Sequence, residues 1–238
     1  SKAERISGTL QRLGKMLSLD TPPRRLEAFD ISNLAGTDIV ASMVVFVDGK
    51  PDKQGYKRFQ VEGLAGQDDY ASMRQVVARR FRHYCQGDAG FAEAPDVLLI
   101  DGGTAHAEVA RQVLAELNLE IPVFGMVKDN KHRTRALVTP AGQEIALDGT
   151  PGVFALIGSI QEETHRFAIT YNRALRSKRL RHSQLDDIPG IGPKRKSLLL
   201  QRFKSISAIA QAGLPELENI LPADAAAAVY AHFHQEES

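Results

Sequence analysis

The chain has 238 residues, of which 43% are hydrophobic and 25% charged, and its formal net charge is +1. This length suits one domain of ordinary size with a smaller second one, and this composition excludes a disordered or fibrous chain. The sequence has no apolar run of roughly 20 residues and no signal-peptide core, so no membrane contact is expected. Its single cysteine, Cys85, cannot form an internal disulfide, and the expected location is the reducing cytoplasm.

The first third of the sequence predicts a helix followed by three strands. Residues 1–20 form a helical lead-in, because apolar side chains recur at three- and four-residue spacing before the Pro22-Pro23 pair. Strands are predicted at 25–32, 38–49 and 56–62, with turn residues between them. Three consecutive strands at this spacing favour an antiparallel meander.

Helices and strands then alternate. Two acidic residues at 68–69 open a helix, and the almost wholly apolar stretch 96–101 predicts a strand buried on both faces. A helix at about 104–117, the strand PVFGMVK, the hairpin RALVTPAGQEIAL and a long helix at about 153–177 follow. The expected fold is α/β, with a mixed sheet flanked by helices.

Two aspartates end buried strands of this predicted sheet. Asp30 lies near the end of the first strand and Asp101 ends the fourth, and a carboxylate in such a place is costly to desolvate. The first and fourth strands are typically neighbours in this order, so the two carboxylates would repel unless a divalent cation bound them. The alternative is that each aspartate only caps a turn.

A third candidate lies on the long helix. Helical spacing places Glu162 and His165 on one face, so His165 could bind a metal or act on a phosphate while Glu162 orients its ring. The alternative is a half-buried structural histidine. Asp30, Asp101 and His165 are the predicted catalytic and metal-binding set for Mg²⁺ or Mn²⁺, with one or two ions hydrolysing a phosphodiester. Supporting roles are predicted for Glu162, Glu163 and Lys128.

A glycine turn marks a second domain. In IPGIGPKRK, Gly190 and Gly192 let a phosphate approach the backbone, and Pro193 favours the start of a helix whose N-terminus attracts anions. This is the helix-hairpin-helix pattern, which holds the DNA backbone without reading sequence. A second such repeat at 218–233 lacks the glycines, and we expect little or no phosphate binding there.

The charge distribution supports a nucleic-acid partner. Residues 177–206 carry eight Lys or Arg against two acids, whereas residues 207–238 carry five acids and no Lys or Arg. The predicted DNA contacts are Gly190, Gly192, Lys194, Arg195, Lys196, Lys178, Arg179, Tyr56, Arg58 and Arg80.

The predicted boundaries divide the chain into four parts. They are a helical lead-in at 1–20, an endonuclease domain at 21–177, a linker at 178–184 and a tandem helix-hairpin-helix domain at 185–238.

Several long motifs together resemble the C-terminal half of the UvrC family of nucleotide excision repair nuclease subunits. The matching segments are PPRRLEAFDISN, VASMVVFVDGKPDKQGYKRFQVE, DDYASMRQVVARRF, PDVLLIDGG, EETHRFA and IPGIGPKRK. The resemblance implies a ribonuclease H-like endonuclease domain with an Asp-Asp-His site at Asp30, Asp101 and His165. It also implies a tandem helix-hairpin-helix domain and a cut on the 5′ side of a lesion in damaged double-stranded DNA bound by UvrB.

The sequence departs from this family in three respects. The family usually has Asp-Glu-Ala-His where this chain has Glu162-Glu163-Thr164-His165, and the second hairpin is weakened. No GIY-YIG motif and no UvrB-binding helical pair are found, so we expect a fragment that nicks DNA poorly alone. Two alternatives stay open: a non-catalytic DNA-binding module on a ribonuclease H-like scaffold, and a nucleotide-binding protein using Asp101-Gly102-Gly103 as a phosphate loop.

Overall fold

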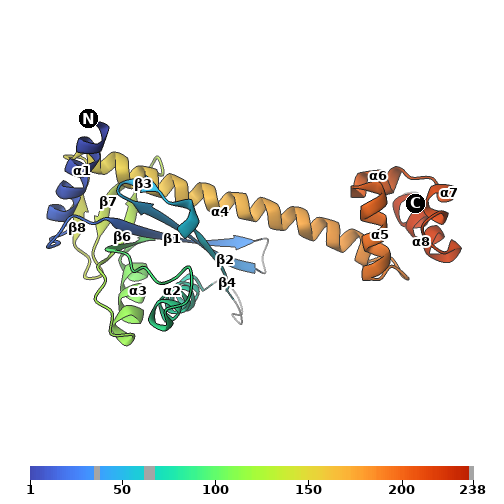
Figure 1. The fold of residues 1–238 in the computed structure, drawn as a ribbon, viewed down its shortest axis with the longest axis horizontal. Coiled ribbons are helices and arrows are strands. Elements are labelled where there is room, and N and C mark those ends of the chain that lie inside the picture. Colours follow the sequence, from blue (N-terminus) through green and yellow to red (C-terminus); the bar gives the residue numbers. More distant parts are fainter. Residues whose placement is uncertain (35–37, 62–67, 236–238) are drawn as a thin grey trace. The chain divides into compact units, whose positions relative to one another are not determined.

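The computed structural model describes residues 1–34, 38–61 and 68–235 (Figure 1). Only the backbone is described for residues 33, 34, 38, 172 and 175–183. The chain divides into two compact units, Ser1–Thr170 and Tyr171–Ser238. Within the described residues, no helix is both long and apolar enough to span a membrane.

A mixed eight-stranded sheet forms the centre of the first unit. Its strands are β1 (Arg25–Leu34), β2 (Asp38–Val47), β3 (Lys50–Pro51), β4 (Lys57–Val61), β5 (Val97–Asp101), β6 (Val123–Lys128), β7 (Thr134–Val138) and β8 (Glu144–Ala146). The order is β3-β2-β1-β5-β6-β7-β8, with β4 also paired to β2. Strands β1, β5 and β6 run parallel, whereas the other pairs are antiparallel. The predicted mixed α/β sheet is confirmed; only the two-residue β3 is too short to show a period in the sequence.

Helices cover both faces of this sheet (Figure 1). Helices α2 (Asp69–Gln86) and α3 (Thr104–Glu116) pack on one face, in a core that includes Phe29 and Ile100. Helix α1 (Lys2–Met16) and the first part of α4 (Pro151–Asp186) pack on the other face, whose core includes Ala28 and Leu99. A short 3₁₀ helix, η1 (Lys53–Gly55), precedes β4. Side chains alternate between the two faces along a strand. The core to which Phe29 and Ile100 belong therefore shows which face the next side chain of β1 and of β5 points to.

Helix α4 is longer than the sequence predicted. The backbone at 178–184 is helical, so the structure has a helix where a linker was expected. The physical reason is visible in the sequence, since no Gly or Pro interrupts the chain between Gly158 and Pro189. The boundary between the two units, at Thr170, lies within this helix.

The second unit is all-helical, as predicted. Its helices are the end of α4, α5 (Pro193–Phe203), α6 (Ile206–Gln211), α7 (Leu214–Glu218) and α8 (Ala223–Phe233). They enclose a separate core that includes Leu199, Leu217 and Val229, each almost fully buried. The divergent segment 218–233 therefore contributes to packing, because its apolar positions are retained although its glycines are absent.

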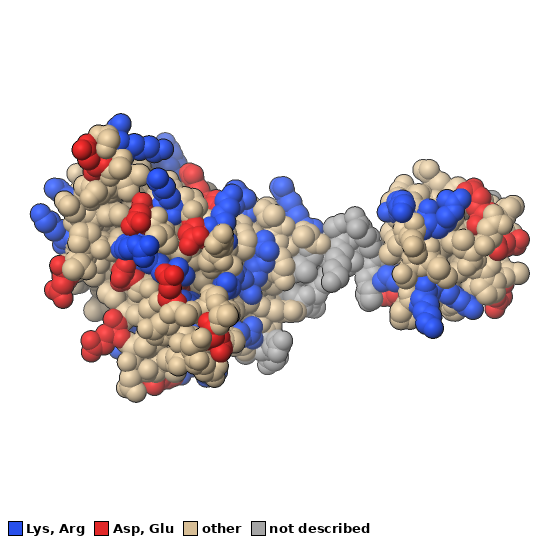
Figure 2. Space-filling model, viewed as in Figure 1, with Lys and Arg blue, Asp and Glu red and all other residues tan. Residues whose placement is uncertain are grey.

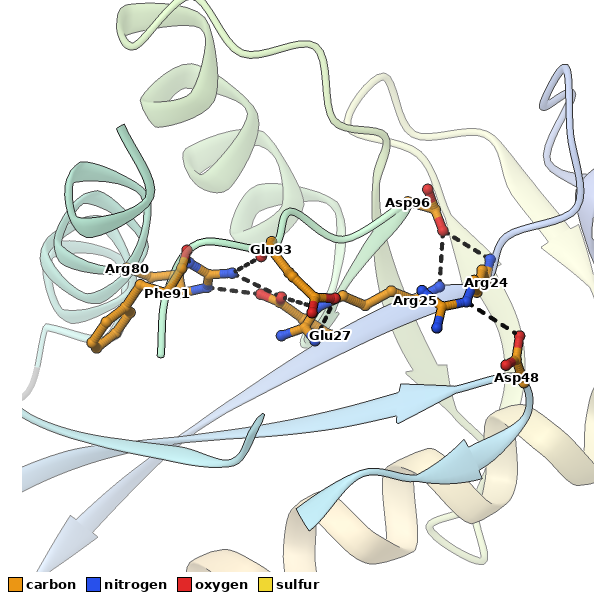
Figure 3. Close-up of polar contacts among 8 residues, drawn as sticks. All are labelled: Arg24, Arg25, Glu27, Asp48, Arg80, Phe91, Glu93 and Asp96. Carbon is orange, nitrogen blue, oxygen red and sulfur yellow. Dashed lines mark hydrogen bonds and ion pairs between the residues drawn. The ribbon is translucent and has the colours of Figure 1, made fainter. Parts of the chain in front are cut away.

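The prediction that Arg80 contacts DNA is wrong. Its side chain is fully buried in α2, where Nε and a terminal nitrogen donate to the two carboxylate oxygens of Glu27, each at 2.9 Å (Figure 3). Further hydrogen bonds go to the carbonyls of Phe91 at 3.0 Å and Glu93 at 2.6 Å. Arg25 also donates to Glu27, at 2.9 Å. This buried network of hydrogen bonds connects α2 to β1, and the Arg80 side chain is not accessible to a phosphate.

Candidate active site

Strand pairing brings Asp30 and Asp101 together. Strands β1 and β5 are parallel neighbours with Phe29 opposite Ile100, so Asp30 and Asp101 are the next residues on the two strands. The predicted pairing of these strands is confirmed. Phe29 and Ile100 belong to the core under α2 and α3, so alternation points both carboxylates to the face that α1 and α4 cover.

Burial and repulsion alter the acidity of this pair. The pKa of Asp30 rises to about 7, first because the carboxyl is buried and then because Asp101 repels its ionised form and shares a hydrogen bond with it. Lys128 and Ser32 act in the opposite direction, and the Ser32 hydroxyl donates to Asp30 Oδ2 over 3.5 Å. The positive charge of Lys128 therefore does not offset burial and repulsion at Asp30, and an additional cation would favour ionisation of both carboxylates.

Lys128 supplies part of that charge. Strand β6 lies beside β5, with Met126 opposite Asp101. Lys128 follows Met126 by two residues, so its side chain points to the same face of the sheet as Asp101. Its Nζ lies 2.9 Å from Asp101 Oδ1 and 3.1 Å from Oδ2. The β6–β7 pairing shifts register between Val127 and Lys128, an irregularity of the kind that often redirects a side chain next to a site.

His165 lies on α4 and lines a cavity of 660 Å³ together with Lys128 and Glu162. His165 and Glu162 are both exposed and are three residues apart on one helix face, as predicted. In the described part of the chain, however, no three His, Cys, Asp or Glu side chains are grouped closely enough to hold a metal ion. The structure thus brings the two aspartates together and leaves His165 outside a three-residue metal group.

The donor set at the two aspartates suits a hard divalent cation. Carboxylate oxygens are the ligands that Mg²⁺ and Mn²⁺ prefer, and the raised pKa of Asp30 indicates that the pair needs positive charge. The ammonium of Lys128 already lies within ion-pair distance of Asp101, which indicates where a cation is stabilised.

Glu163, predicted to have a supporting role, connects α4 to the segment that precedes β4. Its carboxylate accepts hydrogen bonds from the Tyr56 hydroxyl at 2.9 Å and from Arg166 at 2.6 and 2.8 Å. These donors, Arg166 above all, lower the pKa of Glu163. The Tyr56 ring meets Phe167 edge-on at 5.1 Å, and the Arg58 guanidinium lies 4.1 Å above the same ring. Tyr56 therefore uses its hydroxyl within the protein, whereas Arg58 is exposed.

Sequence reasoning missed Gln161 and the loop of residues 129–133, which lies between β6 and β7. Residues 131–133 of this loop and Gln161 line the cavity together with Lys128 and His165. The only signal was the basic run Lys131-His132-Arg133 in a turn, and such a run usually indicates a solvated loop.

The glycine turn of the second unit has the expected conformation. Gly190 has a φ of +84°, which favours glycine, and Gly192 caps the N-terminus of α5 with open space around its α-carbon. Arg195 donates to the Gly190 carbonyl at 2.7 Å, and Lys196 pairs with Asp186 at 3.4 Å, so both are partly engaged within the protein.

Lys194 is exposed at the start of α5. Figure 2 shows lysine and arginine side chains gathered over one part of this unit and acidic side chains over another. The side chains of Lys178 and Arg179, also predicted to contact DNA, lie outside the described residues.

The second repeat has a different helix start. Pro222 precedes α8, and the Asp224 carboxylate accepts a hydrogen bond from the Ala225 backbone amide at 2.9 Å. An acid already occupies the anion-attracting end of this helix, which is in keeping with the expectation of little or no phosphate binding there.

The sheet order and the helices on its two faces define an RNase H-like α/β domain. A family model described as the UvrC RNase H endonuclease domain matches residues 14–169. The chain belongs to this UvrC family.

Relatives that are named UvrABC system protein C support the assignment. The one from Acetivibrio thermocellus is 44% identical over 245 residues, covering 96% of this chain and 39% of its own length. The one from Clostridioides difficile is 42% identical over 239 residues, covering 100% of this chain and 38% of its own length. The chain thus spans less than two fifths of these relatives. Among solved structures, human endonuclease V aligns with 74% of this chain and 97% of its own, at 12% identity and a TM-score of 0.41.

Proposed function

We propose that this chain is the endonuclease part of a nucleotide excision repair nuclease, hydrolysing a phosphodiester of the damaged strand on the 5′ side of a lesion. The observation that carries the proposal is the pair Asp30 and Asp101, side by side on central parallel strands and short of positive charge. Family membership supports the same reaction, since the matching model describes an endonuclease domain.

Asp30 and Asp101 would hold Mg²⁺ or Mn²⁺. A divalent ion at this position supplies Lewis acidity toward a phosphoryl oxygen and neutralises the charge that develops there. Lys128 contributes a further positive charge 2.9 Å from Asp101, which favours an anionic substrate at the same place. His165 is exposed on α4 and lines the same cavity as Lys128, the lysine that pairs with Asp101, and we propose that its imidazole contacts the phosphate or moves a proton to or from it.

The second unit is proposed to hold the DNA. The amide end of α5, behind Gly190 and Gly192, offers unpaired N–H groups to a backbone phosphate, and Lys194 adds charge next to them. Such contacts position a duplex without reading sequence. We propose that the substrate reaches the site as a complex of damaged duplex with UvrB, in keeping with the UvrABC system named for the relatives.

Incision of a UvrB-bound, damaged, 3′-nicked duplex tests the proposal. Wild-type protein is expected to cut 5′ of the lesion with Mg²⁺ or Mn²⁺ and to be inactive in EDTA. Asp30→Asn and Asp101→Asn are each expected to lower the incision rate by more than about 100-fold, because loss of even an outer-shell partner of a metal ligand costs about 10- to 100-fold. His165→Ala is expected to lower it by about 100-fold or more, which is the usual contribution of a group that transfers a proton.

A matched control separates chemistry from folding. Asp20→Asn, at an exposed aspartate of the same unit, should incise like the wild type. Incision that survives in folded Asp30→Asn and Asp101→Asn would overturn the site assignment. A wild-type protein that binds the duplex but never cuts it, with any divalent ion, would support the non-catalytic DNA-binding alternative.

A further inference from the structure

The loop of residues 129–133 is held in one conformation by its own contacts. The Asp129 carboxylate accepts hydrogen bonds from the backbone amides of Lys131 at 2.8 Å and Arg133 at 2.9 Å, and it pairs with the Arg133 guanidinium at 3.2 Å. The Asp129 amide donates to the Arg133 carbonyl at 2.7 Å. His132 has a φ of +60°, in the left-handed region that residues other than glycine rarely adopt. The surrounding contacts maintain this strained turn.

Gln161 ties this loop to the helix that carries His165. Its amide nitrogen donates to the His132 carbonyl at 3.2 Å, and its amide oxygen accepts from the Thr134 hydroxyl at 3.2 Å. Thr134 is buried at the start of β7, so the second bond anchors Gln161 to the sheet. Gln161 precedes His165 by one helical turn, which places loop and histidine on the same side of α4.

The space between loop and helix is the cavity already described, and its wall is rich in positive charge. Its charged lining residues are the basic Lys128, Lys131 and Arg133 and the acidic Glu162. Lys128 also pairs with Asp101, and Arg133 with Asp129. Lys131 and Arg133 are both exposed, and among the described residues the Lys131 ammonium makes no ion pair. The cavity volume of 660 Å³ lies in the range of about 300–1,000 Å³ typical of ligand sites. A concave, water-accessible surface with surplus cations attracts phosphate.

We propose that Lys131 and Arg133 bind the DNA phosphate next to the one that is cut, and that Gln161 is the positioning residue that keeps their loop against α4. The inference rests on the proposed function for the identity of its substrate. Lys128 links the two places, because it contacts Asp101 and also lines the cavity. A strand whose scissile phosphate lies at Asp101 would therefore continue along the cavity, toward the loop.

Neutralising one phosphate at a time tests this contact. A series of UvrB-bound, 3′-nicked damaged duplexes would each carry a single uncharged methylphosphonate at a position around the cut. For wild-type protein, one position adjacent to the cut is expected to lower kcat/KM about tenfold, because a charge-assisted hydrogen bond is worth about 1.5–3 kcal/mol.

The variant Lys131→Gln with Arg133→Gln should lower kcat/KM on the unmodified duplex by a similar factor, mainly through KM. On the sensitive methylphosphonate duplex it should show little further loss, because both changes remove the same interaction. Lys15→Gln, at an exposed lysine of α1, is the matched control and should lose nothing. Losses that multiply, or a double variant equal to the wild type, would overturn the proposal.

Gln161 is tested by the same series. Gln161→Ala should raise KM several-fold, change kcat by less than about twofold and reduce the sensitivity to the methylphosphonate. If Gln161→Ala unfolds the protein, Gln161→Glu serves, since it can still accept from Thr134 but cannot donate to the His132 carbonyl. A purely structural role would lower Tm and leave the methylphosphonate sensitivity at its wild-type value, which would contradict a positioning role.

Failure of this inference differs from failure of the proposed function. If wild-type protein cuts no duplex, the proposed function fails, and the same duplexes are then used in fluorescence anisotropy titrations. An adjacent methylphosphonate that weakens binding to wild-type protein, but not to the Lys131→Gln, Arg133→Gln variant, supports the loop contact. Equal binding of all duplexes by both proteins overturns it.

Discussion

Removing the Asp30 carboxyl should stabilise the metal-free protein, because Asp30 is buried next to a second carboxyl, that of Asp101. The pKa of Asp30 rises from its ordinary value of 3.8 to about 7 on folding, first through burial and then through repulsion by Asp101. The folded state therefore binds a proton more tightly than the unfolded chain does. Stability is unaffected below pH 3.8, falls as the pH rises from 3.8 to 7, and stays at its lower value above pH 7.

The magnitude follows from this difference in pKa. Each pKa unit corresponds to about 1.36 kcal/mol. The raised pKa of Asp30 therefore lowers the free energy of unfolding by about 4 kcal/mol at pH 8, where the folded carboxyl is ionised, and by about 0.5 kcal/mol at pH 4. Asp30→Asn keeps the size of the side chain and cannot ionise. Its free energy of unfolding should therefore exceed the wild-type value by up to about 4 kcal/mol at pH 8 and by less than about 1 kcal/mol at pH 4.

Differential scanning calorimetry in EDTA measures this effect. For a unit of this size, about 1 kcal/mol corresponds to a Tm change of about 2–4 °C, so the gain at pH 8 should be easily resolved. Asp20→Asn, at an exposed aspartate, is the control and should shift Tm little at either pH. A gain that is the same at pH 4 and pH 8, or a loss at pH 8, would refute the reasoning.

Three further predictions follow from metal binding, the buried ion network and the glycine turn. Mg²⁺ at about 100 times its Kd should stabilise wild-type protein by about 2.7 kcal/mol at pH 8 and Asp30→Asn by much less; equal Tm shifts would contradict metal binding there. Arg80→Met should lower the free energy of unfolding, measured in urea, by about 3–5 kcal/mol, because it leaves the buried carboxylate of Glu27 with Arg25 as its remaining partner. Adding Glu27→Leu should restore part of the lost stability. Gly190→Ala should lower the free energy of unfolding by about 1 kcal/mol, because residue 190 has a positive φ. Gly192→Ala should leave Tm unchanged but weaken duplex binding in anisotropy titrations, because the added methyl group occupies open space. Unchanged binding by Gly192→Ala would contradict a close approach of phosphate to this glycine.

Local patterns in the sequence predicted most of the secondary structure. The apolar stretch at 96–101 became β5, the acids at 68–69 became the start of α2, and Pro193 began α5. The two aspartates could also be found, because a carboxylate at the end of a buried strand is conspicuous, and the strand order then implied that they are neighbours. Each of these inferences depends on residues close together in the chain, or on a strand pairing that the order of elements already restricts.

Only the tertiary structure decided the state and surroundings of these residues. Arg80 was misjudged as a DNA contact because its partner, Glu27, lies 53 residues away in the chain, and only packing makes it a buried ion pair. The raised pKa of Asp30 depends on burial that no local pattern encodes. Gln161 was overlooked for the same reason, since its role depends on His132 and Thr134, almost 30 residues earlier. Side-chain periodicity is a short-range property, whereas burial, charge pairing and cavities arise between segments that are distant in sequence.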